Sequence, residues 1–151
     1  MSDRTFKLTV VSPDKALVLN LPVIAVGAMG SEGAFTALPG HLPFLTELKA
    51  DQMWYRLPDQ SVQEILVSGG FVEVLPERVT ILANSAERPN EIDPERAERA
   101  RLRSLSKLKS LKEKIAEGEI SYTEGEIEIK KAEIKLIRSM ARLKAVRTRH
   151  K

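Results

Sequence analysis

The sequence changes its hydrophobic period once, near residues 86–94, and this change constrains the fold more than any other feature. Before it, apolar residues recur at every second position, and after it they recur at every third or fourth. A period of two is typical of half-buried strands, whereas a period near 3.6 is typical of amphipathic helices. We therefore predict two units, an N-terminal β-domain over residues 1–88 and a C-terminal helical unit over residues 89–151.

The N-terminal half consists of short alternating runs. Residues 6–11 alternate apolar and polar side chains, as expected for a strand with one buried face. Similar runs follow at 21–26, 34–38, 44–48, 53–56, 62–67, 71–75 and 79–82. Turns rich in proline and glycine separate them, and no helical stretch intervenes. The pattern predicts an all-β sandwich.

The C-terminal half carries signals for two helices. Pro89 disfavours helix at the residue before it, so a linker is expected there. Asp93 followed by Pro94 suits a helix start, and Gly118 suits its end. Ser121 opens a capping box for a second helix. The expected apolar stripes are Ala97, Leu105, Leu108, Leu111 and Ile115 in the first helix, and Ile129, Ala132, Leu136, Met140 and Leu143 in the second. Two such helices predict an antiparallel α-helical hairpin.

Composition excludes several classes of protein. The chain of 151 residues has no cysteine, so it has neither disulfides nor thiolate metal sites, and two histidines are too few for a zinc site. No apolar run approaches the ~20 residues of a membrane span, and the N-terminus lacks an apolar signal core. We expect a cytoplasm-like compartment, with membrane association only through a partner.

No pattern predicts catalysis or a metal site. The glycines at 27, 30 and 33 are not followed by the Lys-Ser/Thr of a phosphate loop. Ser68 lies between two strands and not at a strand-to-helix elbow. His41 has no identifiable acid partner for a proton relay. We therefore predict a protein that is not an enzyme by itself and requires no cofactor.

Basic residues are concentrated in the helical half. Residues 1–90 carry 7 Lys/Arg and 10 Asp/Glu, a net charge of −3, while residues 91–151 carry 17 and 11, a net charge of +6. Residues 99–112 contain six cations and residues 135–151 contain seven, with no acid in either run. Such runs favour an acidic partner, whether protein, nucleotide or nucleic acid, over a merely solvated face. Nucleic acid is disfavoured because Tyr122 is the only aromatic residue in this half.

Several stretches, in order along the chain, resemble the ε subunits of F-type ATP synthases. These are residues 8–13, residues 30–46 with Leu-Pro-Gly-His at 38–41, residues 67–74, residues 79–83, and residues 86–88 with 92–97. The resemblance covers nearly the whole chain and agrees with the two-unit prediction. The alternative is a β-sandwich adaptor whose basic hairpin binds nucleic acid or an acidic protein.

The resemblance implies a place in the central stalk of a proton-translocating ATP synthase. The sandwich is expected to dock on the γ subunit and the ring of c subunits, with Glu32 and His41 at the contact. The hairpin is expected to inhibit ATP hydrolysis by reaching the catalytic α/β head through Arg138, Arg142 and Lys144. The implied location is the cytoplasmic face of a bacterial plasma membrane, as a peripheral protein.

The resemblance also implies a regulatory nucleotide. Ile92, Asp93, Arg96 and Ala97 match a motif that holds ATP against the hairpin in some bacterial relatives. Arg96 is the expected phosphate contact, because a guanidinium can bind phosphate oxygens in a bidentate way.

Overall fold

The computed structural model describes residues 4–149, which divide into two compact units between Glu91 and Ile92. Within the described residues, the first unit contains strands β1 Phe6–Val11, β2 Ala16–Val23, β3 Ala25–Gly30, β4 Gly33–Ala37, β5 Phe44–Arg56, β6 Val62–Leu75, β7 Arg78–Ala83 and β8 Ala86–Glu87, followed by the short 3-10 helix η1 Pro89–Glu91. The second unit contains α1 Pro94–Ala116 and α2 Tyr122–Arg149. The sandwich and the helical hairpin predicted from the sequence are confirmed.

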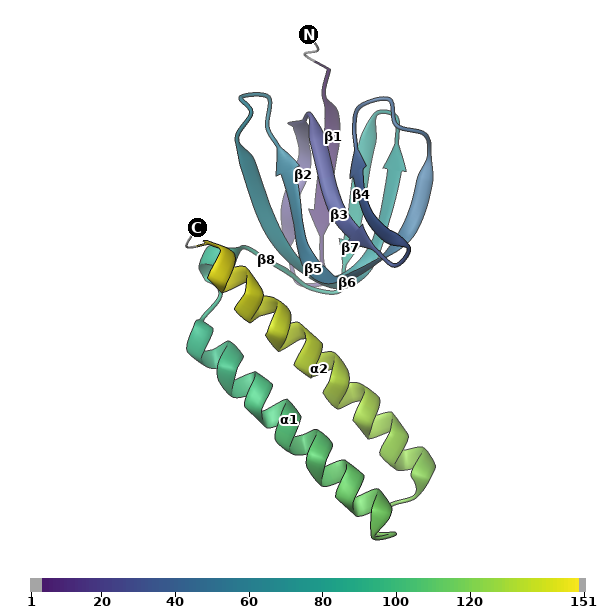
Figure 1. The fold of residues 1–151 in the computed structure, drawn as a ribbon. Coiled ribbons are helices and arrows are strands. Elements are labelled where there is room, and N and C mark those ends of the chain that lie inside the picture. Colours follow the sequence, from purple (N-terminus) through teal and green to yellow (C-terminus); the bar gives the residue numbers. More distant parts are fainter. Residues whose placement is uncertain (1–3, 150–151) are drawn as a thin grey trace. The chain divides into compact units, whose positions relative to one another are not determined.

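The described strands form a single sheet that curves around one core (Figure 1). Its order is β2-β1-β7-β6-β5-β3-β4, and β8 pairs with β6. Neighbouring strands are antiparallel except for β1 and β7, which are parallel. The core is mostly aliphatic, and its largest fully buried side chains include Phe6, Leu8, Met53, Tyr55, Ile65 and Ile81.

Two strands are longer than the sequence predicts. The runs at 44–48 and 53–56 are both part of β5, and those at 62–67 and 71–75 are both part of β6. Pairing between β5 and β6 extends from Phe44 opposite Val74 to Arg56 opposite Val62. Gly69 and Gly70 have φ of 103° and 131°, so they bend β6 where the sequence suggested a turn. A Cβ on Gly70 would collide with the carbonyl oxygen of Leu82.

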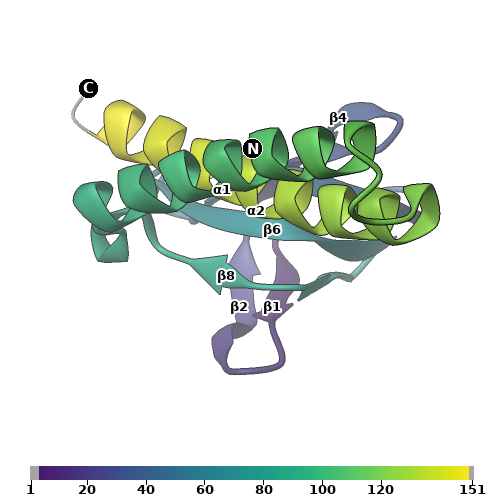
Figure 2. The ribbon, with the colours of Figure 1, turned by 90° about the horizontal axis from the view of Figure 1, so that it is seen from below.

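The helix ends follow the predicted signals. Asp93 Oδ1 accepts hydrogen bonds from the backbone N–H of Glu95 at 3.0 Å and of Arg96 at 3.3 Å. Gly118 has φ of 74° just beyond the end of α1. Ser121 Oγ accepts from the Glu124 N–H at 3.2 Å, which caps α2. The two helices run side by side over their length (Figure 2).

The apolar stripes agree with the prediction only in part, since Ala97, Leu111 and Ala132 are buried as expected. Apart from Ala145, the buried positions recur every seventh residue in both helices, at Ala97, Ser104 and Leu111 in α1 and at Gly125, Ala132, Ser139 and Val146 in α2. We call these residues the seam. Leu105 and Met140, which were expected on the stripes, are exposed. Small side chains let helix backbones approach closely, so the larger residues next to the seam do not fit between the two helices.

Candidate functional site

The first unit exposes three large apolar side chains on the outer face of the sheet. Phe71 in β6 lies directly opposite Leu82 in β7, and Leu45 in β5 lies diagonally from Phe71 on the same face. Their exposed fractions are 54% for Phe71, 57% for Leu82 and 70% for Leu45. We call these residues the apolar sheet face.

The strand that carries Phe71 is held on both sides. β6 is hydrogen-bonded to β5 and to β7, so the apolar sheet face is presented on a rigid support. Glu47 and Glu73 lie beside Phe71 on the same face. The loop that leads into β5 adds two further exposed leucines, Leu38 and Leu42. An apolar surface with a polar rim suits protein docking.

The structure separates the two residues expected at the rotor contact. Glu32 is exposed in the turn before β4, whereas His41 is half-buried in the loop after β4. The His41 N–H donates to the Leu38 carbonyl at 3.0 Å, and its Nδ1 lies 2.7 Å from the Leu42 carbonyl oxygen. Its ring centroid is 6.1 Å from that of Phe44. His41 therefore orders the loop next to Leu45, and Glu32 lies beyond the opposite end of β4.

The second unit contains a groove between α1 and α2 with a volume of about 800 Å³. Six cations line it, from both helices: Arg103, Lys107, Lys131, Lys135, Arg138 and Arg142. Small residues, among them Ser104 and Ala132 of the seam, complete the lining. We call this feature the basic groove.

The charges of the basic groove are poorly balanced. Glu128 is the one acid among the described lining residues, and its Oε1 lies 3.2 Å from Lys131 Nζ. Arg138 Nε is buried and has no hydrogen-bond partner in the described part of the chain. An unpaired buried guanidinium nitrogen is costly, so this lining suits an anionic ligand.

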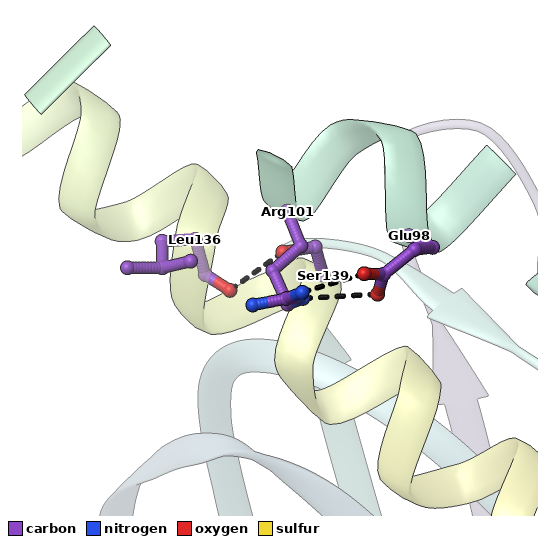
Figure 3. Close-up of polar contacts among 4 residues, drawn as sticks. All are labelled: Glu98, Arg101, Leu136 and Ser139. Carbon is purple, nitrogen blue, oxygen red and sulfur yellow. Dashed lines mark hydrogen bonds and ion pairs between the residues drawn. The ribbon is translucent and has the colours of Figure 1, made fainter. Parts of the chain in front are cut away.

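An ion pair also lies on α1. Arg101 Nε donates to Glu98 Oε2 at 2.9 Å, and the guanidinium lowers the pKa of the Glu98 carboxyl (Figure 3). Ser139 Oγ, on α2, donates to the Leu136 carbonyl oxygen at 2.7 Å, which satisfies a hydroxyl buried in the seam. Both contacts join residues three positions apart within one helix, so they stabilise the helix that contains them.

The four residues expected to bind nucleotide do not line the basic groove. Ile92 and Ala97 are buried, and the Asp93 carboxylate caps α1. Arg96 is exposed. It precedes Arg103 by seven residues, or about two turns, so both lie on one face of α1, roughly 10 Å apart along the helix axis.

The inhibitory residues expected from the sequence are partly brought together. Arg138 and Arg142 both line the basic groove, whereas Lys144 does not. Sequence reasoning missed the contribution of α1, Arg103 and Lys107, although the run at 99–112 had marked this helix as basic.

A metal site and a membrane-spanning helix both lack a candidate among the described residues. No group of three or more His, Cys, Asp or Glu side chains is placed to hold a metal ion there. None of the described helices has the length and apolarity needed to cross a membrane.

Comparison with known families covers both units. Residues 5–89 match the ATP synthase delta/epsilon chain β-sandwich domain, and residues 90–147 match the long α-helix domain of the same chain. The chain belongs to the ATP synthase delta/epsilon family. Both matches follow the division between sheet and helices seen in the structure.

Relatives within this family carry the name ATP synthase epsilon chain. The protein of Nitratidesulfovibrio vulgaris strain Hildenborough is 43% identical over 113 residues, which are 75% of this chain and 83% of the relative. That of Syntrophobacter fumaroxidans is 42% identical over 109 residues, 72% of this chain and 80% of the relative. This chain is therefore an epsilon-type member of the family.

Solved structures support the same fold. A chain of the Euglena gracilis mitochondrial ATP synthase, from a structure of its OSCP/F1/c-ring, matches with a TM-score of 0.73 at 22% identity, over 91% of this chain and 78% of that one. A chain from the central stalk and c-ring of the Tetrahymena thermophila enzyme matches with a TM-score of 0.51 at 17% identity, over 60% and 72%.

Proposed function

We propose that this chain is a non-catalytic rotor subunit that couples the γ subunit to the c ring of a proton-translocating ATP synthase. The apolar sheet face is the observation that carries the proposal. A monomer gains nothing from exposing Phe71, Leu82 and Leu45 together, whereas a docking partner would remove them from water. Full burial of one such side chain is worth about 1.5–3 kcal/mol. Family membership favours this function over the nucleic-acid adaptor.

The test is a docking experiment with matched substitutions. Phe71→Asp and Leu82→Asp should each weaken copurification with γ and the c ring at least about tenfold, because a buried unpaired carboxylate costs more than 1.4 kcal/mol. Val62→Asp is the control, since Val62 is also exposed on β6 but lies nine residues from Phe71. If Phe71→Asp and Leu82→Asp copurify with γ and the c ring as well as the control Val62→Asp does, the apolar sheet face is not the docking surface.

We propose further that the hairpin inhibits ATP hydrolysis through the cations of α2. The basic groove and the residues that follow it offer an acidic segment of the catalytic head several cations at once. Each exposed pair is worth only ~0.2–1 kcal/mol, but several together shift an equilibrium of a few kcal/mol. Exchanging Arg138, Arg142 and Lys144 for Glu should raise hydrolysis by the assembled complex. If hydrolysis stays the same while the complex remains assembled, the hairpin is not a brake.

ATP is proposed as a regulatory ligand of the hairpin. Arg96 and Arg103 would face its phosphates from α1, and Arg138 and Arg142 from α2. Calorimetry with ATP should give binding heats that fall in Arg96→Ala and in Arg103→Ala. If the binding heat falls in Arg103→Ala but not in Arg96→Ala, the ATP site is the basic groove without Arg96. If the unsubstituted chain gives no binding heat, ATP is not a ligand of the hairpin.

A further inference from the structure

The segment between β7 and the hairpin is part of the sandwich and not a free linker. The sequence predicts a linker at the residue before Pro89. In the structure, Ala86 and Glu87 form β8, which pairs with β6 at Val67 and Leu66 (Figure 2). Ala86 is buried in the core of the sandwich. The Ser68 N–H donates to the Ser85 carbonyl at 3.0 Å, which extends this attachment by one residue.

Arg88 fastens the next part of the segment. Its Nη1 donates to the hydroxyl oxygen of Tyr55 at 2.9 Å, and its guanidinium carbon lies 5.9 Å from the centre of the Tyr55 ring. Tyr55 is only 2% exposed and lies within β5. A charged donor gives a stronger hydrogen bond than a neutral one, and the ring face adds a cation–π contact.

The segment is held up to its last residue. The Glu91 N–H donates to the Arg88 carbonyl at 2.9 Å and closes η1. The Glu91 carboxylate lies 3.5 Å from Lys15 Nζ, at the start of the β-domain. These contacts all join residues of the first unit, which ends at Glu91.

We propose that the Arg88–Tyr55 contact is a clamp that keeps residues 84–91 on the sandwich, so that any reorientation of the hairpin begins after Glu91. Released from β8 onward, the six residues 86–91 would extend by up to roughly 20 Å at 3.3–3.6 Å each. The clamp therefore sets how far the start of α1 can travel from the sandwich. Its effect on hydrolysis rests on the proposed brake, but the clamp itself does not.

Amide hydrogen exchange in the full chain tests the clamp. Arg88→Ala should speed exchange in residues 84–91 by about 10- to 100-fold, the range expected for losing a hydrogen bond from a charged group. Tyr55→Phe removes only the hydroxyl and should give a smaller increase at the same residues. Exchange should also rise at residues 66–68 of β6, which pair with the segment, and should not change in β5 or in the rest of β6. Arg56→Ala is the control, because Arg56 also stacks on an aromatic ring, at 5.6 Å from the centre of Trp54, and is outside the segment.

The outcomes separate the clamp from the brake. Exchange at 84–91 that stays at the unsubstituted rate in both Arg88→Ala and Tyr55→Phe would overturn the clamp. If Arg88→Ala speeds exchange throughout the sheet, the exchange rates of Tyr55→Phe alone decide whether the clamp exists. Faster exchange confined to 84–91 and to its partners at 66–68 supports the clamp, whether or not hydrolysis by the assembled complex changes. Unchanged hydrolysis in that case would count against the brake only.

A distance measurement gives an independent readout. The chain has one tryptophan, Trp54, and no cysteine, so Asn90→Cys creates a single labelling site within the segment. Energy transfer from Trp54 to a label at position 90 should fall when Arg88→Ala is added and stay constant when Arg78→Ala is added. Equal transfer in both would contradict the clamp.

Discussion

Gly125 is expected to allow the close approach of α1 and α2. In an exposed helix, replacing glycine with alanine stabilises by up to ~1 kcal/mol. Gly125 is buried in the seam, and a Cβ there would lie 2.5 Å from Ile115 Cγ1 and closer still to Cδ1. The colliding atoms end the Ile115 side chain, which can shift, so the overpacking cost lies near the lower end of the usual range, at about 1 kcal/mol. Gly125→Ala should therefore lose the gain from its better helix propensity and leave the stability of the paired helices within about ±0.5 kcal/mol.

A double-mutant cycle isolates the cause. Ile115→Ala removes the colliding atoms, so in that background Gly125→Ala should stabilise the hairpin by about 0.5–1 kcal/mol. The opening free energy of α1 and α2 is measured by amide exchange in the full chain. Glu126→Ala, an exposed neighbour, should stay within about ±0.5 kcal/mol in either background. Stabilisation by Gly125→Ala of the same size in both backgrounds would refute the close approach of the helices at this point.

Three further predictions concern single positions. Gly70→Ala should destabilise the sandwich by roughly 3 kcal/mol or more in urea unfolding, because φ of 131° and the Leu82 carbonyl both oppose a side chain. Asp93→Ala should cost the start of α1 about 1 kcal/mol, seen as faster exchange in its first turn. The hydrogen bond from Arg101 lowers the pKa of Glu98 in the folded chain. The ionised Glu98 should therefore stabilise α1 at pH values above its ordinary pKa of 4.5, and this stabilisation should be lost as the pH falls through the lower pKa of the folded chain. Glu98→Gln should remove that step from an acid titration followed by circular dichroism.

The division into sheet and helices was predictable from the sequence because local signals agreed. The caps at Asp93 and Ser121 and the end at Gly118 depend on neighbouring residues only, and all three predictions are confirmed. The continuity of β5 and β6 was not predictable in this way. Glycine pairs usually mark turns, and only the partner strand shows that Gly69 and Gly70 bend β6 without ending it.

The candidate sites were less predictable because they combine distant residues. The alternation in 71–75 contains a usable signal, since Phe71 is in phase with the exposed Glu73 and out of phase with the buried Val72 and Val74. Nothing in the sequence places Leu82 beside Phe71, because that pairing depends on register. The seam was predicted only in part: Ala97, Leu111 and Ala132 were expected on the stripes, whereas Ser104, Gly125, Ser139 and Val146 were not. Ser104 and Ser139 are polar, but helix-to-helix distance favours small residues over apolar ones at these positions.

The two surfaces differ in the kind of binding that they support. The apolar sheet face acts by removing side chains from water, an effect that does not weaken when salt rises. The basic groove would act through charge, and the screening length falls from ≈10 Å at 0.1 M to about 3 Å at 1 M. The proposed function requires permanent docking and reversible inhibition, and these demands conflict if one surface serves both. Because the surfaces belong to different units and the segment to Glu91 belongs to the sandwich, the proposed function predicts that salt releases the hairpin from an acidic partner while the sandwich stays docked.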